Sequence, residues 1–283
     1  MILVADSGSS KTDWLIDIPG QQPQGFTTAG INPYFLTEKE IIKILQSQCA
    51  DTVKKAGKID EIYFFGAGCS NPDKREMVSN ALSHVFPKIF ISVDTDLLGS
   101  AYATCGTEKG YCCVLGTGSN VSFFNGESIV DGNHGIGYVL GDEGSGTYFG
   151  KKLITDYLYG NMPADISHQF TERFQLDKEQ VIKKVYQESH ANTYLASFAR
   201  FLSATKETFY TRELIEAGFT EFIETNIKTY RDHQKYKFHF VGSIAYHFRD
   251  ILAMLCSEND IQLGKVIKQP ITDLMEFVLT HNV

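Results

Sequence analysis

The sequence has no apolar run that approaches the roughly 20 residues needed for a transmembrane helix. Its first apolar stretch, Met1 to Ala5, ends at Asp6 after only a few residues, whereas a signal peptide has a longer apolar core behind positive charge. We therefore expect no membrane partner and a cytoplasmic location.

Cysteine and histidine pairs spaced for metal binding are also missing. The six cysteines include no CxxC motif, and the eight histidines include no HxxxH or HExxH pair. In a reducing compartment, scattered cysteines usually act as small buried hydrophobes. We therefore expect no structural zinc site. The cysteines are Cys49, Cys69, Cys105, Cys112, Cys113 and Cys256.

Basic residues are too few for a nucleic-acid surface. The chain has 26 Lys and Arg against 34 Asp and Glu, which gives a net charge of −8, and binding to nucleic acid needs clustered cations that neutralise phosphates. An anionic substrate would instead be held by backbone amides and a metal ion. With 283 residues, 43% of them hydrophobic, the chain can build one large core or two modest ones, and we expect two lobes.

The pattern along the chain is typical of an α/β protein. Apolar strand-like runs alternate with helical patterns in the first half, and Thr37 with Glu40 forms a capping-box signature that starts a helix. The expected strands there are Ile2–Ala5, Trp14–Ile18, Asp60–Gly66 and Lys88–Val93. Later expected segments are strands Cys112–Leu115, Val121–Asn125 and Phe238–Val241, and helices Ala245–Leu255 and Ile271–Leu279.

Two strand–turn–strand units resemble each other. Ser7-Gly8-Ser9 and Thr117-Gly118-Ser119 each follow an apolar strand and precede another, so the chain looks internally duplicated. The first turn continues through Ser10, Lys11 and Thr12, and small residues of this kind let backbone N–H groups converge on an anion. Neither turn is a P-loop or a dinucleotide fingerprint, because the glycine spacing differs. An ordinary hairpin is the alternative for either turn alone, but two matched turns facing a cleft would suit a nucleotide.

Several carboxylates lie beside these turns. Asp96 follows the strand Lys88–Val93, where α/β sheets present their ligand sites, and we choose it as the base that deprotonates or orients an attacking hydroxyl. A helix N-cap is its alternative role, and Asp94 is the rival base. Asp6 is placed to bind Mg²⁺ through water. Asp142 lies in the glycine-dense stretch 132–150, where the backbone can approach a ligand closely.

These segments together resemble the N-acetylglucosamine kinases and the wider BadF/BadG/BcrA/BcrD ATPase family, in the superfamily of sugar kinases, heat-shock chaperones and actin. The strongest likeness is the segment from Gly135 to Gly146, which contains Gly141-Asp142-Glu143-Gly144-Ser145. The segment Thr95–Ser100 is similar to the one that carries the family's catalytic aspartate. The segments 6–12, 116–120 and 241–245 are similar to the two phosphate loops and the adenosine segment.

The resemblance implies a fold of two duplicated ribonuclease-H-like, actin-like ATPase lobes around a nucleotide cleft. The first lobe would comprise residues 1–104 plus 271–283, and the second, with a helical insertion, residues 105–270. It also implies a kinase that uses ATP and Mg²⁺ to phosphorylate an N-acetylhexosamine, first of all N-acetylglucosamine to its 6-phosphate. The expected partner is a small-molecule sugar, and the sequence leaves a homodimer open.

The resemblance and the loop positions together assign site residues. Asp96 is the catalytic base and also contacts the sugar, and Asp6 is the metal residue. The expected ATP-binding residues are Gly8, Ser9, Ser10, Lys11, Thr12, Thr117, Gly118, Gly242 and Ser243. The expected sugar-binding residues are Asn32, Asp96, Ser119, Asn120, Gly135, Ile136 and Asp142.

Two other functions stay open from the sequence. Some relatives are ATPases that activate CoA-thioester dehydratases or reductases through an iron–sulfur cluster bridging two subunits, which requires exposed cysteine thiolates. Cys69 is the one cysteine in a loop-like setting, whereas Cys112 and Cys113 lie in an apolar strand. The second alternative is a sugar or nucleotide sensor without catalysis.

Overall fold

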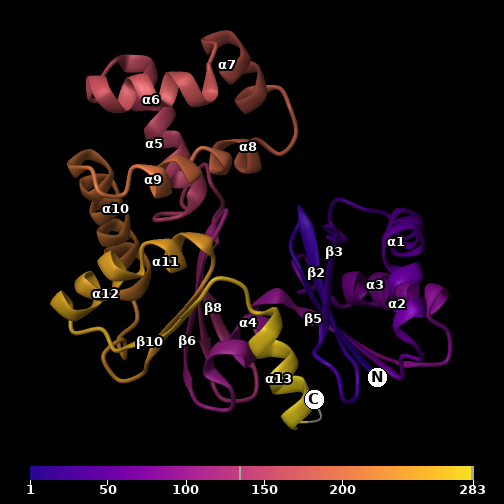
Figure 1. Ribbon diagram of the computed structural model, residues 1–283. Helices are drawn as coiled ribbons and strands as arrows, with labels where there is room; N and C mark the ends of the chain where they lie inside the picture. Colours follow the sequence, from indigo (N-terminus) through magenta and orange to yellow (C-terminus); the bar gives the residue numbers. More distant parts are fainter. Residues whose placement is uncertain (134, 282–283) are drawn as a thin grey trace. The chain divides into compact units, whose positions relative to one another are not determined.

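The computed structural model describes residues 1–133 and 135–281, so residues 134, 282 and 283 of the predicted lobes lie outside the described residues. The chain divides into two compact units (Figure 1). Unit 1 comprises Met1–Glu108, Gly126–Ile129 and Gln269–Val283, and unit 2 comprises Lys109–Asn125 and Val130–Lys268. The lobe boundaries expected from the sequence stay a prediction about domain organisation.

Unit 1 is built on a five-stranded sheet in the order β3-β2-β1-β4-β5. Strands β1, β2 and β3 form an antiparallel meander, and β4 and β5 add in parallel beside β1. The bounds are β1 Ile2–Ser7, β2 Lys11–Asp17, β3 Gln24–Ala29, β4 Glu61–Gly66 and β5 Phe90–Thr95.

Helices cover both faces of this sheet (Figure 1). On one face, apolar side chains of β1, β2 and β4 pack against α1 Glu38–Ile44, the π-helical turn Leu45–Cys49, α2 Ala50–Ala56 and α3 Pro72–Val85. On the other, α4 Asp96–Cys105 and α13 Ile271–His281 pack against each other and against the central strands. The last helix of the chain therefore belongs to the same unit as its first strand.

Unit 2 contains a sheet of the same order, read as β8-β7-β6-β9-β10. Strand β6 pairs with β7 in antiparallel fashion and with β9 in parallel, as β1 pairs with β2 and β4. The bounds are β6 Gly110–Leu115, β7 Ser119–Phe124, β8 Ile129–Asn133, β9 Phe238–Val241 and β10 Leu263–Ile267. The duplication predicted from the two hairpins thus extends to all five strands.

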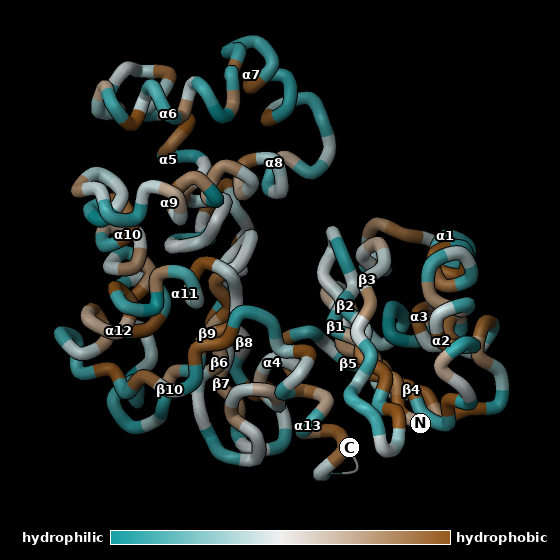
Figure 2. The backbone as a smooth tube through the Cα atoms, in the orientation of Figure 1, coloured by the Kyte–Doolittle hydropathy of each residue, from teal (hydrophilic) through white to brown (hydrophobic). Residues whose placement is uncertain are grey.

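Most of the helices of unit 2 lie between β8 and β9 in the sequence. They are α5 Gly146–Tyr159, α6 Ala164–Phe174, α7 Lys178–Tyr186, α8 Ala191–Ser197, α9 Arg200–Ala204, α10 Phe209–Phe222 and a π-helical turn Ile223–Ile227. Helices α11 Ser243–His247 and α12 Arg249–Glu258 follow β9. Their apolar faces share one core with the strands, and Figure 2 shows β6 and β9 among the most hydrophobic segments.

The sequence predicted the central elements well and the edges poorly. The capping box at Thr37 is present, with the side chains and backbone N–H groups of Thr37 and Glu40 bonded reciprocally. Strands β3, β8 and β10 were not predicted, and the expected helix 245–255 is divided at Phe248. Among the described residues, no helix is both long and apolar enough to cross a membrane.

Candidate active site

Three aspartates of unit 1 lie on the same face of the first sheet. Asp6 of β1 is in register with Asp13 of β2 on one side and with Phe65 of β4 on the other, and Phe65 is in register with Asp94 of β5. Residues paired across neighbouring strands point to the same face. Asp13 was missed by the sequence analysis, because the expected strand began at Trp14 whereas β2 begins at Lys11.

Helix α4 places Asp96 beside this row of carboxylates. The N-cap is Thr95, whose Oγ1 accepts a hydrogen bond from the Leu98 N–H at 3.1 Å, so the N-cap role considered for Asp96 is wrong. Asp96 is the first helical residue, and its Oδ1 accepts from the Leu97 N–H at 3.0 Å. A side chain at Gly99 would come within 2.8 Å of Phe65 Cβ, so glycine lets α4 pack closely onto β4.

Two of these carboxyl groups, those of Asp6 and Asp96, hold protons unusually tightly. Burial, together with the negative charges of Asp96 and Asp13, raises the pKa of Asp6 to about 7, while Lys11 opposes the rise. Burial likewise raises the pKa of Asp96 to about 6, against the hydrogen bond from Leu97. A carboxylate with a pKa near neutrality can accept a proton from a substrate more readily than an exposed one.

The first loop presents two backbone donors without acceptors. The Gly8 N–H closes the turn on the Lys11 carbonyl at 3.0 Å, while the N–H groups of Ser9 and Ser10 have no acceptor within the described ranges. Adjacent N–H groups of this kind are what an anion site requires. A Cβ at Gly30 would lie 2.5 Å from the Gly8 carbonyl oxygen, so the loop rests directly on the backbone after β3.

Two buried hydroxyl groups stabilise the hairpin formed by β1 and β2. Ser7 and Thr12 are fully buried, with their oxygens 2.6 Å apart, and Ser7 also exchanges hydrogen bonds with the backbone of Ile31. Thr12 donates to the Ala29 carbonyl at 3.2 Å. Its hydroxyl therefore stabilises the hairpin, and Thr12 as an ATP-binding residue stays a prediction. Lys11 is half exposed and forms an ion pair with Asp13 at 2.6 Å.

Asn32 is joined to this loop. Its Nδ2 donates to Ser9 Oγ at 2.8 Å, and its Oδ1 accepts from the Tyr34 N–H at 3.0 Å. The side chain is buried, and a Cβ at Gly68 would lie 2.3 Å from Oδ1. The structure thus brings Asn32, the first loop, Asp6 and Asp96 together in unit 1.

The second loop, in unit 2, repeats the arrangement of the first. The Gly116 N–H donates to the Gly118 carbonyl at 3.0 Å, and in the described part of the chain the N–H groups of Thr117 and Gly118 again lack acceptors. The start of α5 holds the loop, since Thr147 donates through its N–H and its hydroxyl to the Thr117 carbonyl, at 3.0 and 2.7 Å. Two equivalent turns therefore each carry two unpaired amides.

Asp142 packs against this second loop. Its backbone has a positive φ of 62°, an uncommon conformation for a residue with a side chain, and its Oδ1 accepts from the Ser119 N–H at 3.2 Å. A Cβ at Gly118 would lie 2.9 Å from Oδ2, so glycine is needed there. Burial raises the pKa of Asp142, the Ser119 N–H lowers it, Glu143 raises it and Lys151 lowers it.

The remaining predicted sugar contacts lie close to Asp142 in the chain or in space. Asn120 is half-buried on β7 and accepts through Oδ1 from the Ser122 hydroxyl at 3.1 Å. A Cβ at Gly135 would come 3.0 Å from Asn120 Nδ2. Ile136 is 58% exposed and packs against Gly141. Unit 2 therefore places predicted polar groups near the exposed apolar side chain of Ile136.

Gly242 lies against the second loop at the end of β9. Its φ is 132°, and a Cβ there would lie 2.2 Å from the Leu115 carbonyl oxygen and 2.9 Å from the Gly116 nitrogen. Its N–H donates to the Ile267 carbonyl at 2.9 Å. Ser243 follows as an exposed residue at the start of α11. The predicted adenosine segment and phosphate loop are thus neighbours.

The described residues contain no group of three or more His, Cys, Asp or Glu side chains arranged to hold a metal by themselves. Asp6 alone fits the predicted role, because Mg²⁺ at nucleotide sites takes most of its ligands from phosphates and water. Two concavities of unit 2 lie elsewhere, one on α10 and α12 and one between α5 and α7. Neither concavity is lined by a predicted site residue.

Among solved structures, a candidate N-acetylglucosamine kinase from Porphyromonas gingivalis is 35% identical to this chain, with 100% of each chain covered and a TM-score of 0.91. The chain belongs to the family of that protein. A candidate N-acetylglucosamine kinase from Chromobacterium violaceum is 15% identical, with 98% of each chain covered and a TM-score of 0.73. A ROK-family glucokinase from Streptomyces griseus, solved with glucose and AMPPNP, is 12% identical, with 98% of this chain and 97% of that chain covered and a TM-score of 0.55.

The two more distant matches show a common fold, and they confirm the predicted class of two α/β units of actin-like ATPase type. No family model and no curated protein matches the chain. The finer assignment to the BadF/BadG/BcrA/BcrD family therefore stays a prediction.

Proposed function

We propose that the protein is an ATP-dependent sugar kinase and that its acceptor is an N-acetylhexosamine, first of all N-acetylglucosamine, phosphorylated at the 6-hydroxyl. The observation that carries the proposal is the position of Asp96. Asp96 is the first residue of α4, directly after β5, and Thr95 rather than Asp96 caps the helix. Burial raises the pKa of Asp96 to about 6. The full-length match to a candidate kinase of that class supports it.

In this proposal Asp96 accepts the proton of the sugar hydroxyl while the hydroxyl oxygen bonds to the γ-phosphorus. The bond from the γ-phosphorus to the β–γ bridging oxygen breaks, and ADP leaves. The unpaired amides of Ser9, Ser10, Thr117 and Gly118 would bind phosphate oxygens, which is the main protein contribution to a loose phosphoryl-transfer transition state. Mg²⁺, when bound, would neutralise phosphate charge, with Asp6 orienting its water.

Sugar binding is assigned to groups in both units. Asn32 retains one amide hydrogen and one lone pair beyond its bonds to Ser9 and Tyr34, and Asp142 retains its Oδ2. Ile136 offers an exposed apolar surface that would suit an acetyl methyl group. A group that hydrogen-bonds the acetamide should reject sugars without it far more strongly than a methyl contact alone can.

The iron–sulfur activator receives no support from the cysteines. All six are buried, and burial raises the pKa of Cys69 to about 12, with Asp96 adding to the effect and Arg75 opposing it. A thiol in that state is a poor cluster ligand, since iron binds the thiolate. A sensor without catalysis would use Asp96 only to hydrogen-bond a ligand, so sugar-dependent ADP release separates the kinase from the sensor.

The test is ADP release with Mg-ATP over N-acetylated hexosamines, amino sugars and plain hexoses, followed by competition among N-acetylglucosamine, glucosamine and glucose at equal concentrations. We expect ADP release to depend on sugar and N-acetylglucosamine phosphate to predominate by mass spectrometry. Equal ADP release without any sugar would contradict the kinase. Predominance of glucose 6-phosphate or glucosamine phosphate would contradict only the choice of acceptor.

A further inference from the structure

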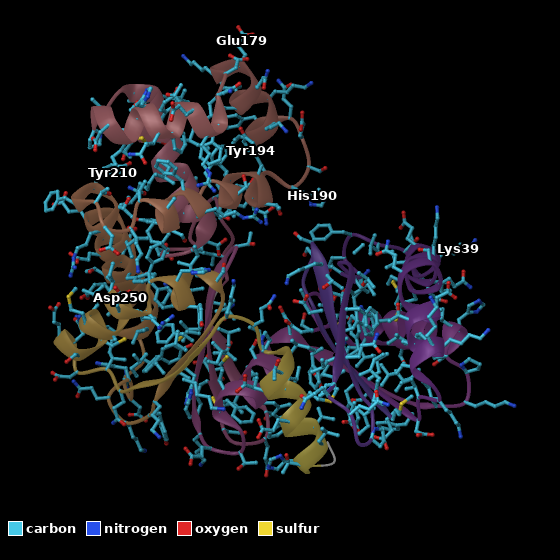
Figure 3. All side chains as sticks on the ribbon, in the orientation of Figure 1. Lys39, Glu179, His190, Tyr194, Tyr210 and Asp250 are labelled. Atoms are coloured by element: carbon cyan, nitrogen blue, oxygen red, sulfur yellow. The ribbon has the colours of Figure 1, made fainter. Side chains whose placement is uncertain are left out.

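An apolar groove lies between two helices of the insertion in unit 2, in the region that Glu179 on α7 and Tyr194 on α8 mark in Figure 3. We call it the α5–α7 groove, and its volume is about 650 Å³. It is lined by Tyr138, Val139, Lys151, Ile154, Thr155, Leu158, Tyr159, Lys178, Val181, Ile182, Val185, Tyr186 and Leu195.

One face of each helix forms the walls. The lining residues of α5 begin at Lys151 and those of α7 at Lys178, and both sets recur at i, i+3, i+4, i+7 and i+8, the spacing of a single helical face. Leu195 of α8 is a buried residue in the same lining. Five of these side chains are large exposed hydrophobics, namely Val139, Leu158, Tyr159, Ile182 and Tyr186. Exposed apolar side chains gathered in one concavity indicate a binding surface.

The charge of the groove is opposite to that of the chain. Lys151 and Lys178 are the charged residues of its lining, which contains no Asp or Glu, whereas the whole sequence has a net charge of −8. The volume is within the range of small-molecule sites, roughly 300 to 1,000 Å³. A two-fold contact with a second copy would place the same lysine-bearing surface against itself, which like charges oppose.

We propose that the α5–α7 groove is a regulatory site that binds a small organic anion with an apolar body, and that Lys151 connects this site to the glycine-rich segment. Lys151 Nζ donates to the Tyr138 carbonyl at 2.6 Å, and Tyr138 lies between Ile136 and Asp142 in the chain. An anion that bonds Lys151 competes with that carbonyl and so alters the segment assigned to the sugar. This second part rests on the proposed function.

The test uses 1-anilinonaphthalene-8-sulfonate as an anionic apolar probe. Fluorescence titration of the wild type should show saturable binding of one probe per chain. Ile182→Glu, which adds a carboxylate at a 44%-exposed position of the groove, should weaken binding at least about tenfold. Phe209→Glu is the matched control, because Phe209 is a 75%-exposed aromatic of α10 in the same unit and outside the groove. It should change the Kd less than about twofold.

Both variants are first checked for wild-type circular dichroism and thermal unfolding, and Lys178→Glu provides a second groove variant. The site is refuted if Ile182→Glu and Lys178→Glu both bind the probe like the wild type, if Phe209→Glu loses binding equally, or if ATP removes all the binding. A concentration-dependent dimer that Ile182→Glu abolishes would show a second copy as the occupant and overturn the small-anion assignment.

The regulatory effect has its own readout. Saturating probe should change the KM for N-acetylglucosamine about fivefold or more in the wild type and leave it unchanged in Ile182→Glu. An equal change in both proteins, or none in either, would remove the connection through Lys151. Absence of sugar-dependent ADP release would contradict the proposed function, while the fluorescence titration would still decide whether the groove binds the anion.

Discussion

Replacing Asp96 by asparagine should nearly abolish phosphoryl transfer and leave nucleotide binding close to intact. The new side chain would keep an oxygen for the hydrogen bond from the Leu97 N–H, now 3.0 Å from Oδ1, and Thr95 would still cap α4. The substitution therefore removes the proton acceptor and the charge while preserving the local structure. Stability should not fall, because the replaced carboxyl is buried and its ionisation is unfavourable.

The magnitude follows from the role of a positioned base. General-base catalysis contributes about 10²- to 10⁴-fold, which corresponds to roughly 3 to 5 kcal/mol of activation free energy. In the wild type, kcat/KM should rise with pH through about 6, the pKa of Asp96, because the base must lose its proton before it can accept one from the sugar.

The assay couples ADP release to a chromogenic reaction over a pH range of about 5 to 8, and calorimetry with a non-hydrolysable ATP analogue measures binding separately. Asp94→Asn is the matched control, since Asp94 lies two residues earlier and its Oδ1 accepts from the Thr95 N–H at 2.7 Å. A severe loss in Asp94→Asn with a mild one in Asp96→Asn would show that the base has been misassigned. Loss of ATP binding in Asp96→Asn would show that Asp96 acts in binding instead.

Further predictions concern Gly242 and the buried carboxyl groups of Asp6 and Asp96. Gly242→Ala should destabilise the protein and weaken ATP binding, because the new Cβ would lie 2.2 Å from the Leu115 carbonyl oxygen. The control is Gly160→Ala, at a positive φ with open space around it, which should lower the free energy of unfolding by only about 1 kcal/mol. Equal thermal shifts in the two variants would contradict the steric argument. Stability without ligand should fall as pH rises from about 4 to 7, because the pKa values of Asp6 and Asp96 are raised above 3.8 and the folded state binds those protons more tightly. Asp6→Asn should reduce this loss of stability and raise Tm at a pH of about 8 by a few degrees, since Tm changes by about 2 to 4 °C per kcal/mol. Calorimetry at mildly acidic and mildly basic pH would check this.

The elements that the sequence predicted best are those with strong local signals. The hairpins were found from short apolar strands around small residues, and the duplicated pairing of β1, β2, β6 and β7 follows from them. The capping box fixed the start of α1 at Thr37 because two side chains three residues apart satisfy each other's backbone donors. Such interactions need no information about the rest of the fold.

The missed features depend on contacts between distant segments. Strand β3 contains Gln24, Gly25 and two threonines and has no apolar run, and it forms because β2 offers its free edge. Asp13 was overlooked for a related reason, since only the register of β1 and β2 shows that it shares a face with Asp6. Likewise, the sequence could not show that the Thr12 hydroxyl bonds the Ser7 hydroxyl and the Ala29 carbonyl.

The raised pKa values of Asp6 and Asp96 also depend on contacts that the sequence does not show. Position in the sequence suggested two carboxylates at strand ends, but it could not show that Gly99 lets α4 approach β4 closely enough to bury them near each other. Burial raises both pKa values and so makes ionisation of either carboxyl group less favourable. Under the proposed function, Mg²⁺ near Asp6 would offset the cost of ionisation there, and Asp96 would accept the proton of the sugar hydroxyl.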